Sequence, residues 1–344
     1  MIGKLAVGLA AGAAACVGYG TFIESGAFRV RRVRVPVLPP GAPKVRVLHV
    51  SDVHLYPGQR RKLAFVSNLA ALEPDLVVST GDNIAHPEAL EPLLGALGRL
   101  LDAPGVFVFG SNDYSGPGAS NPLGYLARST SRHGLPEDRK TLPTEALRAG
   151  LSAGGWRDVN TSRATLEIRG LRVEFRGTDD AHLHRDDYSR VAGPPSDGTD
   201  LSVGVTHAPY LRVIDAMAAD GVPLVFAGHT HGGQVCVPLW GALTTNCDLP
   251  PARAKGLSPN LTDPWPSPTT PHPADDAEPN PDPPLRWSGL WRPRAAGASG
   301  PDGAANPTSW LHVSAGVGSS PFAPYRFACP PEVTLLTLVP ASNG

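Results

Sequence analysis

Five short polar clusters, each directly after an apolar run, constrain the fold and chemistry of this chain more than any other feature. The apolar runs are residues 45–50, 76–80, 106–109, 201–205 and 224–227. They are rich in β-branched residues and bounded by Gly, Pro or Asp, as expected of buried strands. In an open α/β sheet, functional side chains collect at the carboxyl ends of strands, because loops from distant parts of the chain converge there.

The side chains in these clusters are of the kind that binds divalent metal ions. The clusters are residues 51–54, 81–83, 110–113, 206–209 and 228–234. Carboxylate, imidazole and amide groups, with no cysteine, suit Mn, Fe, Zn or Mg and argue against an Fe–S or Cu(I) site. Asp52 and His54 point to the same side of an extended segment, so one ion can take both.

Asp82 lies in a Gly-Asp-Asn turn, and its two carboxylate oxygens make it the natural bridge between two ions. Two ions about 3.5–4 Å apart hold a shared hydroxide and clamp the attacking and leaving oxygens of a phosphoryl group. The pattern therefore predicts a dinuclear metal site for phosphoryl chemistry.

The order of the motifs resembles the calcineurin-like metallophosphoesterase family over residues 44–338. Within that family, the chain is most similar to the membrane-associated bacterial branch. The similarity lies in the Ser-Asp-Val-His opening, the Gly-His-Thr-His-Gly-Gly-Gln motif and the closing Pro-Pro-Glu-Val-Thr strand. The resemblance implies an α/β fold in which two mixed β-sheets pack as a sandwich flanked by helices.

The resemblance also implies a set of ligands for each ion. The first ion would be held by Asp52, His54, Asp82 and His231. The second would be held by Asp82, an oxygen of the Gly-Ser-Asn-Asp turn, His207 and His229.

The Gly-Ser-Asn-Asp turn departs from the Gly-Asn-His-Asp pattern of the family. Ser111 stands where the ligand Asn is expected, and Asn112 stands where the catalytic His is expected. We favour Asn112 over Ser111 as the ligand, because an amide oxygen binds a metal better than a neutral hydroxyl. The acid that protonates the leaving oxygen must then come from another group or from water, unless the leaving group needs none.

Four histidines near the motifs are candidates for that acid: His86, His133, His182 and His184. We favour His182, because the Gly-Thr-Asp-Asp-Ala-His segment follows another apolar run at residues 171–175. The predicted catalytic residues are therefore Asp82, Asn112 and His182.

These features predict a dinuclear-metal-dependent phosphodiesterase, phosphomonoesterase or pyrophosphatase that uses a metal-bridging hydroxide. A lipid-linked or nucleotide-sugar phosphate is one candidate substrate. The alternative is a catalytically weak, membrane-tethered metal-binding scaffold, which only the altered turn favours. The net charge of -1 gives no reason to expect a nucleic-acid partner.

The sequence predicts a division of the chain into three parts. Residues 5–23 carry no charge and approach the roughly 20 residues that span a bilayer, so residues 1–26 predict a membrane anchor or a signal segment. Residues 27–43 predict a linker, and residues 44–340 predict the catalytic domain. Deleting residues 1–26 should then leave a soluble, active enzyme.

Residues 250–306 are Pro-rich and predict an irregular insertion, in which residues 285–291 form an apolar island. The four cysteines show no Cys-x-x-Cys spacing. Cys247 and Cys329 would pair in an oxidising compartment, and isolated buried thiols are the alternative.

Overall fold

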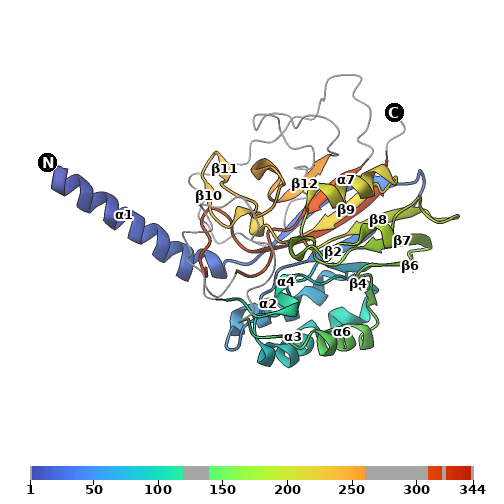
Figure 1. Cartoon of the computed structure of the whole chain (residues 1–344), viewed down its shortest axis with the longest axis horizontal. Coiled ribbons are helices and arrows are strands. Elements are labelled where there is room, and N and C mark those ends of the chain that lie inside the picture. The colour runs from blue at the N-terminus through green and yellow to red at the C-terminus, as the bar shows by residue number, and fades with distance from the viewer. Residues whose placement is uncertain (1, 119–138, 260–308, 320–322, 342–344) are drawn as a thin grey trace, which may run out of the picture.

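Two six-stranded β-sheets, flanked by helices, form the domain (Figure 1). The computed structural model describes residues 2–118, 139–259, 309–319 and 323–341. In spatial order, the first sheet holds β1 (Arg29–Leu38), β14 (Glu332–Pro340), β2 (Val45–Val50), β3 (Leu76–Ser79), β4 (Gly105–Phe107) and β5 (Arg157–Asp158). The second holds β12 (Gly256–Pro259), β13 (Trp310–Val313), β9 (Leu224–Ala227), β8 (Leu201–Val205), β7 (Leu171–Gly177) and β6 (Ser162–Ile168). Both sheets are mixed, which confirms the predicted α/β sandwich.

The main core lies between the two sheets, and a second core lies under the helices of the first sheet. Alternate residues of a strand point to opposite faces. Leu336 and Leu338 of β14 therefore join the core that contains Phe175 and Phe226 of the second sheet. Val333 and Leu335 instead pack with the helices. Each fully buried side chain of this size stabilises the fold by about 1.5–3 kcal/mol.

The helices cover the outer faces of the sandwich (Figure 1). The first sheet is covered by α2 (Arg60–Ser67), α3 (Leu90–Leu97) and α6 (Thr144–Ala153), with the short α4 (Ser111–Tyr114) at one end. Helix α7 (Leu211–Ala219) covers the second sheet, and its buried face includes Ile214 and Met217.

The topology brings the polar clusters to one edge of the sandwich. β2, β3 and β4 are parallel to one another, as are β7, β8, β9 and β13. Five of these strands run through the apolar segments predicted from the sequence. Their carboxyl ends lead directly into the candidate ligand loops, so strand direction assembles the site.

The predicted linker at residues 27–43 is wrong, because these residues contain β1. β1 pairs in parallel with β14 along most of its length. Val33 and Val35 are buried while Arg32 and Arg34 are less so, a period-two pattern typical of a strand with one face on the core. Pro36 is tolerated because β1 lies at the edge of the sheet.

The first ten residues of the predicted Pro-rich insertion are part of the folded domain. Residues 250–259 form a short 3₁₀ turn and β12, which pairs antiparallel with β13. The rest of the predicted insertion, including the apolar island at 285–291, lies outside the described residues.

Of the two alternatives for Cys247 and Cys329, the structure shows isolated buried thiols. Cys247 packs in the cluster that includes α7, whereas Cys329 packs beside Cys236. All four thiols are free.

The amino-terminal segment forms helix α1 (Ile2–Phe22), which projects away from the sandwich (Figure 1). No helix in the described ranges is both long enough and apolar enough to cross a membrane. Membrane attachment of residues 1–26 therefore stays a prediction.

The base of α1 is bonded to the domain, which changes the expected result of truncation. Gly20 accepts a backbone hydrogen bond from Arg326 (3.2 Å), and the Glu24 carboxylate accepts from the N–H groups of Ala328 (3.0 Å) and Cys329 (2.6 Å). We expect deletion of residues 1–26 to lower the free energy of unfolding by about 2 kcal/mol relative to deletion of residues 1–18, because the first deletion removes Glu24. Chemical denaturation of the two truncated proteins measures the difference, and equal stabilities would contradict it.

Candidate metal centre

The candidate ligands have strained backbones. Left-handed φ angles occur at Asp52 (51°), His54 (43°), Asp82 (55°), His229 (68°) and His231 (51°). Residues with a Cβ rarely adopt this region, and each such residue costs about 1–3 kcal/mol unless its surroundings enforce it. Because five candidate ligands share this strain, it points to a functional requirement.

Hydrogen bonds between the loops enforce these conformations. The Asp52 N–H donates to the Gly81 carbonyl and the His54 N–H donates to the Asp82 carbonyl, both at 2.9 Å. These bonds extend the pairing of β2 with β3 beyond the ends of the strands. The first two polar clusters are therefore locked side by side.

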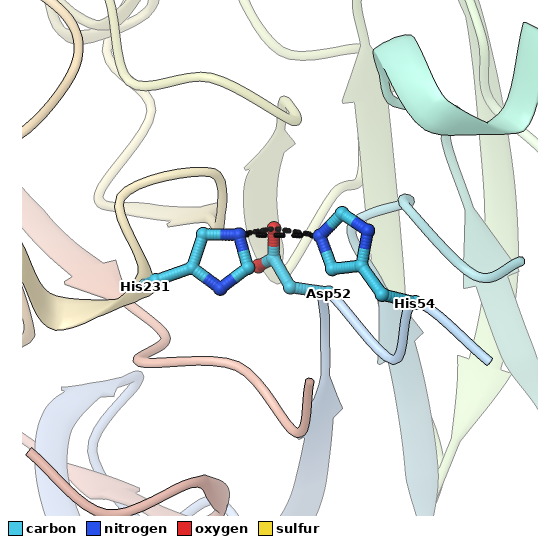
Figure 2. A group of neighbouring side chains, drawn as sticks. All are labelled: Asp52, His54 and His231. Carbon is cyan, nitrogen blue, oxygen red and sulfur yellow. Dashed lines mark hydrogen bonds and ion pairs between the residues drawn. The ribbon is translucent and has the colours of Figure 1, made fainter. Parts of the chain in front are cut away.

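Asp52, His54 and His231 form the first group of converging ligand atoms (Figure 2). His54 Nε2 lies 3.2 Å from His231 Nε2 and 3.9 Å from Asp52 Oδ1, and His231 Nε2 lies 3.6 Å from that same oxygen. These separations fit one divalent ion about 2.1 Å from each atom.

Asp52, Asp82 and His207 form the second group, with ligand atoms within 4.8 Å of one another. Asp82 Oδ2 lies 3.5 Å from His207 Nε2 and 3.3 Å from His54 Nε2. Asp82 therefore faces ligands of both groups. Asp52 belongs to both groups as well, which the sequence had not indicated.

Backbone carbonyls fix the imidazole tautomers. His207 Nδ1 donates to Thr80 O (2.7 Å), His231 Nδ1 to Gly318 O (3.0 Å) and His229 Nε2 to Asn246 O (3.2 Å). The other nitrogen of each ring is then left as an electron-pair donor, as in metal-binding histidines. His207 Nε2 is buried without a hydrogen-bond partner, which fits a position that a cation satisfies.

The protonation states of the buried groups also suit cations. Burial lowers the pKa of His54 to about 4 and that of His231 well below its usual value, so both rings are neutral ligands at pH 7. Burial opposes ionisation of Asp82, but the imidazoles of His207 and His54 hold its pKa well below the usual range. Burial disfavours the charged form of His207, but the carboxylates of Asp82, Asp180 and Asp52 together outweigh it and raise the pKa of that imidazole to about 9 in the metal-free protein, so a metal ion at Nε2 would displace a proton.

Comparison with known proteins decides the family. A family profile described as calcineurin-like phosphoesterase matches residues 45–233, more than half of the chain. The chain belongs to this family. It is therefore a metal-dependent phosphoester hydrolase, and the two converging groups of side chains provide for the two divalent metals that the family uses.

Curated relatives agree with this assignment. The chain is 27% identical to the uncharacterized metallophosphoesterase YkuE of Bacillus subtilis over 71% of this chain and 79% of YkuE. It is 26% identical to phosphodiesterase YaeI of Escherichia coli, over 65% of this chain and 74% of YaeI. A Bos taurus transmembrane protein with metallophosphoesterase domain is 26% identical over 60% of this chain, but only 45% of the bovine protein is matched.

The turn that departs from the family pattern places Asn112 against Asp82. The Asn112 backbone N–H donates to Asp82 Oδ1 (2.7 Å), and Nδ2 donates to Asp82 Oδ2 (2.8 Å). Rotation of the planar amide exchanges its oxygen and nitrogen, so the same position suits a ligand oxygen. Asn112 Nδ2 also lies 3.4 Å from Ser111 Oγ.

Asp113 has a structural role that the sequence analysis did not assign. Its buried carboxylate accepts from the backbone N–H groups of Asp82 (2.8 Å), Asn83 (2.7 Å) and Gly110 (3.0 Å). It therefore joins the second and third polar clusters. A signal was available, because an acidic residue three positions after Gly110 is typical of a capped helix start.

The predicted acid His182 lies at the site but is a poor proton donor. Its ring centroid is 4.6 Å from that of His229, and its Nδ1 lies 3.1 Å from the Tyr210 hydroxyl. Burial lowers the pKa of His182 to about 4, so the ring is neutral at pH 7. His86 caps a 3₁₀ turn through Glu88, and His133 lies outside the described residues.

Asp180 is a buried carboxylate that the sequence analysis passed over in favour of His182. Its Oδ1 accepts from the His182 N–H (2.9 Å), and its Oδ2 is buried without a hydrogen-bond partner. Burial raises the pKa of Asp180 to about 7. Asp180 is also one of the carboxylates that raise the pKa of His207.

Two buried basic residues hold the ligand loops, and no sequence motif marked them. Lys62 Nζ donates to the carbonyls of Val53 (2.7 Å) and His54 (3.4 Å). Arg326 donates to the carbonyls of His231 (3.4 Å) and Ala315 (2.8 Å). Each satisfies carbonyls that would otherwise be buried without partners.

Proposed function

We propose that this chain is a two-metal phosphoester hydrolase whose ligands are those named from the sequence. The first ion is bound by Asp52, His54, Asp82 and His231, and the second by Asp82, Asn112, His207 and His229. The observation that carries the proposal is the position of Asp82, whose Oδ2 lies within 3.5 Å of an imidazole nitrogen from each set.

When bound, the two ions supply a hydroxide at neutral pH and neutralise the charge of the phosphoryl group. The protein holds the ligands before the substrate arrives. Asp82 is fixed by Asn112, and His207 and His231 are oriented by carbonyls. Because these groups are already in place, little reorganisation is required during the reaction.

The leaving oxygen receives no proton from a histidine of the third turn, and His182 is neutral at pH 7. Negative charge therefore accumulates on that oxygen. This supports substrates with good leaving groups, such as diphosphates and phosphodiesters of acidic alcohols. Lipid-linked and nucleotide-sugar diphosphates remain the candidates within this class.

We also propose that residues 1–26 attach the enzyme to a membrane. The uncharged segment at residues 5–23 and the bovine relative with its transmembrane name support this location. The arginines after this segment outnumber the single Lys4 before it, which favours a cytoplasmic catalytic domain, whereas the resemblance to the membrane-associated bacterial branch favours the opposite side.

A chromogenic phosphodiester tests the proposed activity. We expect chelation to abolish turnover by the full chain and added Mn to restore it, with close to two ions per active protein by metal analysis. Active protein with one ion or none would contradict the dinuclear assignment. Folded protein that holds two ions but turns over no phosphoester would support the scaffold alternative.

Paired substitutions test the assignment of the altered turn. Asn112→Ala should lower kcat by at least about tenfold and weaken the second metal, because it removes the amide beside Asp82. Ser111→Ala should change little, because a neutral hydroxyl is a poor competitor for that position. Metal titration and turnover measure both effects. The reverse ranking of the two variants would assign the ligand role to Ser111.

A further inference from the structure

Large apolar side chains are exposed in two short segments. Among the described residues, the exposed large apolar side chains are Val17, Tyr19, Phe22, Ile23, Tyr56, Val237, Leu239, Trp240 and Leu243. All but Tyr56 lie either at the end of α1 or directly after it, or in or directly after the hairpin formed by β10 (Cys236–Val237) and β11 (Gly241–Ala242). The exposure is extreme at Phe22 (81%), Leu239 (94%) and Trp240 (79%).

The two segments are neighbours although they are far apart in the sequence. Phe327 lies between them. Its ring is 6.4 Å from that of Tyr19, and its carbonyl accepts from the Cys236 N–H (2.8 Å) at the start of the hairpin. The hairpin labels lie close to the base of α1 in Figure 1. We call the two segments together, residues 17–23 and 237–243, the apolar platform.

Leu239 is strained as well as exposed. Its φ is 70°, a conformation that a leucine rarely adopts and that glycine or asparagine adopts readily. An exposed leucine gains almost no burial to offset this strain. Strain of this kind is retained where a residue has a function beyond the fold.

The platform is connected to the metal centre. A Cβ at Gly233, just after His231, would collide with Ala242 of the hairpin. Asn246, which follows the hairpin, accepts the hydrogen bond from His229. On the α1 side, Arg326 bonds to both Gly20 and His231. Whatever binds the platform therefore lies beside the loops that carry two metal ligands.

We propose that the apolar platform docks on the surface of a lipid bilayer, with the hairpin tip entering the boundary between headgroups and acyl chains. Trp240 has an aromatic body with a polar N–H, which suits that depth. The exposed Arg61 donates to the carbonyl of Gly26 (3.4 Å) and places a positive charge near anionic headgroups. Helix α1, which carries no charge from residue 5 onward, projects from the same platform (Figure 1).

This inference goes beyond the proposed function, because docking requires no hydrolysis. Docking of the hairpin would hold the metal centre near the membrane surface whether or not α1 is a membrane anchor. Substitutions in the platform should therefore leave the hydrolysis of a soluble phosphodiester unchanged. Failure of the docking proposal would not contradict the proposed hydrolase activity, and the reverse also holds.

Vesicles of phosphatidylcholine and phosphatidylglycerol test the docking of the full chain. We expect the double substitution Leu239→Asn with Trp240→Ala to reduce the partition coefficient about tenfold, because two inserted apolar side chains are lost. Thermal stability should not fall, since asparagine relieves the strain at residue 239. The matched control is Glu73→Asn. Like Leu239, Glu73 is exposed and has a left-handed backbone (φ of 45°), and the substitution also introduces an asparagine, but Glu73 lies outside the platform.

Brominated phosphatidylcholine reports the depth of Trp240 even where α1 alone retains the protein on the vesicle. We expect bromolipid quenching of wild-type tryptophan fluorescence to be largely lost in Trp240→Phe, which keeps an aromatic ring and its affinity. Unchanged quenching in that variant, or equal partition of the double variant and wild type, would overturn the proposal. A wild-type dimer that the double substitution converts to monomers would instead show that a second copy covers the platform.

Discussion

Replacing Asp82 with asparagine is expected to lower kcat by about 1000-fold and to release at least one of the two ions. The reason is the position of its carboxylate, which faces His54 at 3.3 Å and His207 at 3.5 Å. Asparagine keeps the size but loses the negative charge and one of the two ligand oxygens. Steady-state turnover and metal analysis of the same preparation measure the two effects together.

Asp102→Asn is the matched control, because Asp102 is an exposed residue at the end of a 3₁₀ turn. It should retain wild-type turnover and metal content. A second readout comes from metal-free protein, in which Asp82→Asn should lower the pKa of His207, since Asp82 is the main group that raises it. A near-normal rate in Asp82→Asn would remove this residue from the mechanism.

The sequence predicted the ligand set because local and long-range signals coincide there. Each candidate ligand follows a strand that is recognisable from its apolar β-branched residues. The strands that precede the ligands are parallel within each sheet, so their carboxyl ends lie at the same edge of that sheet. The sequence did not predict that Asp52 belongs to both groups of ligand atoms. Whether one carboxylate faces two ions depends on its direction, which the sequence does not show.

The supporting residues could not be predicted for a physical reason. Arg326 is more than 90 residues away from His231 in the sequence, and its buried guanidinium acts through contacts with backbone carbonyls. Backbone carbonyls are present at every residue and leave no mark in the sequence. The neutral state of His182 likewise results from burial, which requires the fold.

The error at β1 has a different origin. Val33 and Val35 alternate with charged residues as in a strand, but the four arginines at residues 29–34 make the segment too polar to stand out as one of the apolar runs. An edge strand tolerates this composition, because one of its faces contacts the core while its outer side is open to solvent. Charge was therefore a weaker guide than periodicity.

Gly110→Ala is expected to lower activity about 100-fold, although it adds only one methyl group to a residue that is not itself a candidate ligand. A Cβ at Gly110 would collide with Asp82 Oδ1 and lie 2.6 Å from the His207 ring. The backbone φ is -109°, so alanine is conformationally acceptable and the effect is steric. Overpacking of this kind also costs about 1–3 kcal/mol of stability.

Gly95→Ala is the control for Gly110→Ala, because Gly95 lies within α3 and a Cβ there would contact nothing within 4 Å. It should raise the free energy of unfolding by about 0.5–1 kcal/mol and leave turnover unchanged. The two variants add the same methyl group, so opposite effects on stability isolate the contact with Asp82 and His207. Wild-type activity in Gly110→Ala would mean that these two side chains can move apart without loss of function, and the tight geometry of the second metal group would then not be required for catalysis.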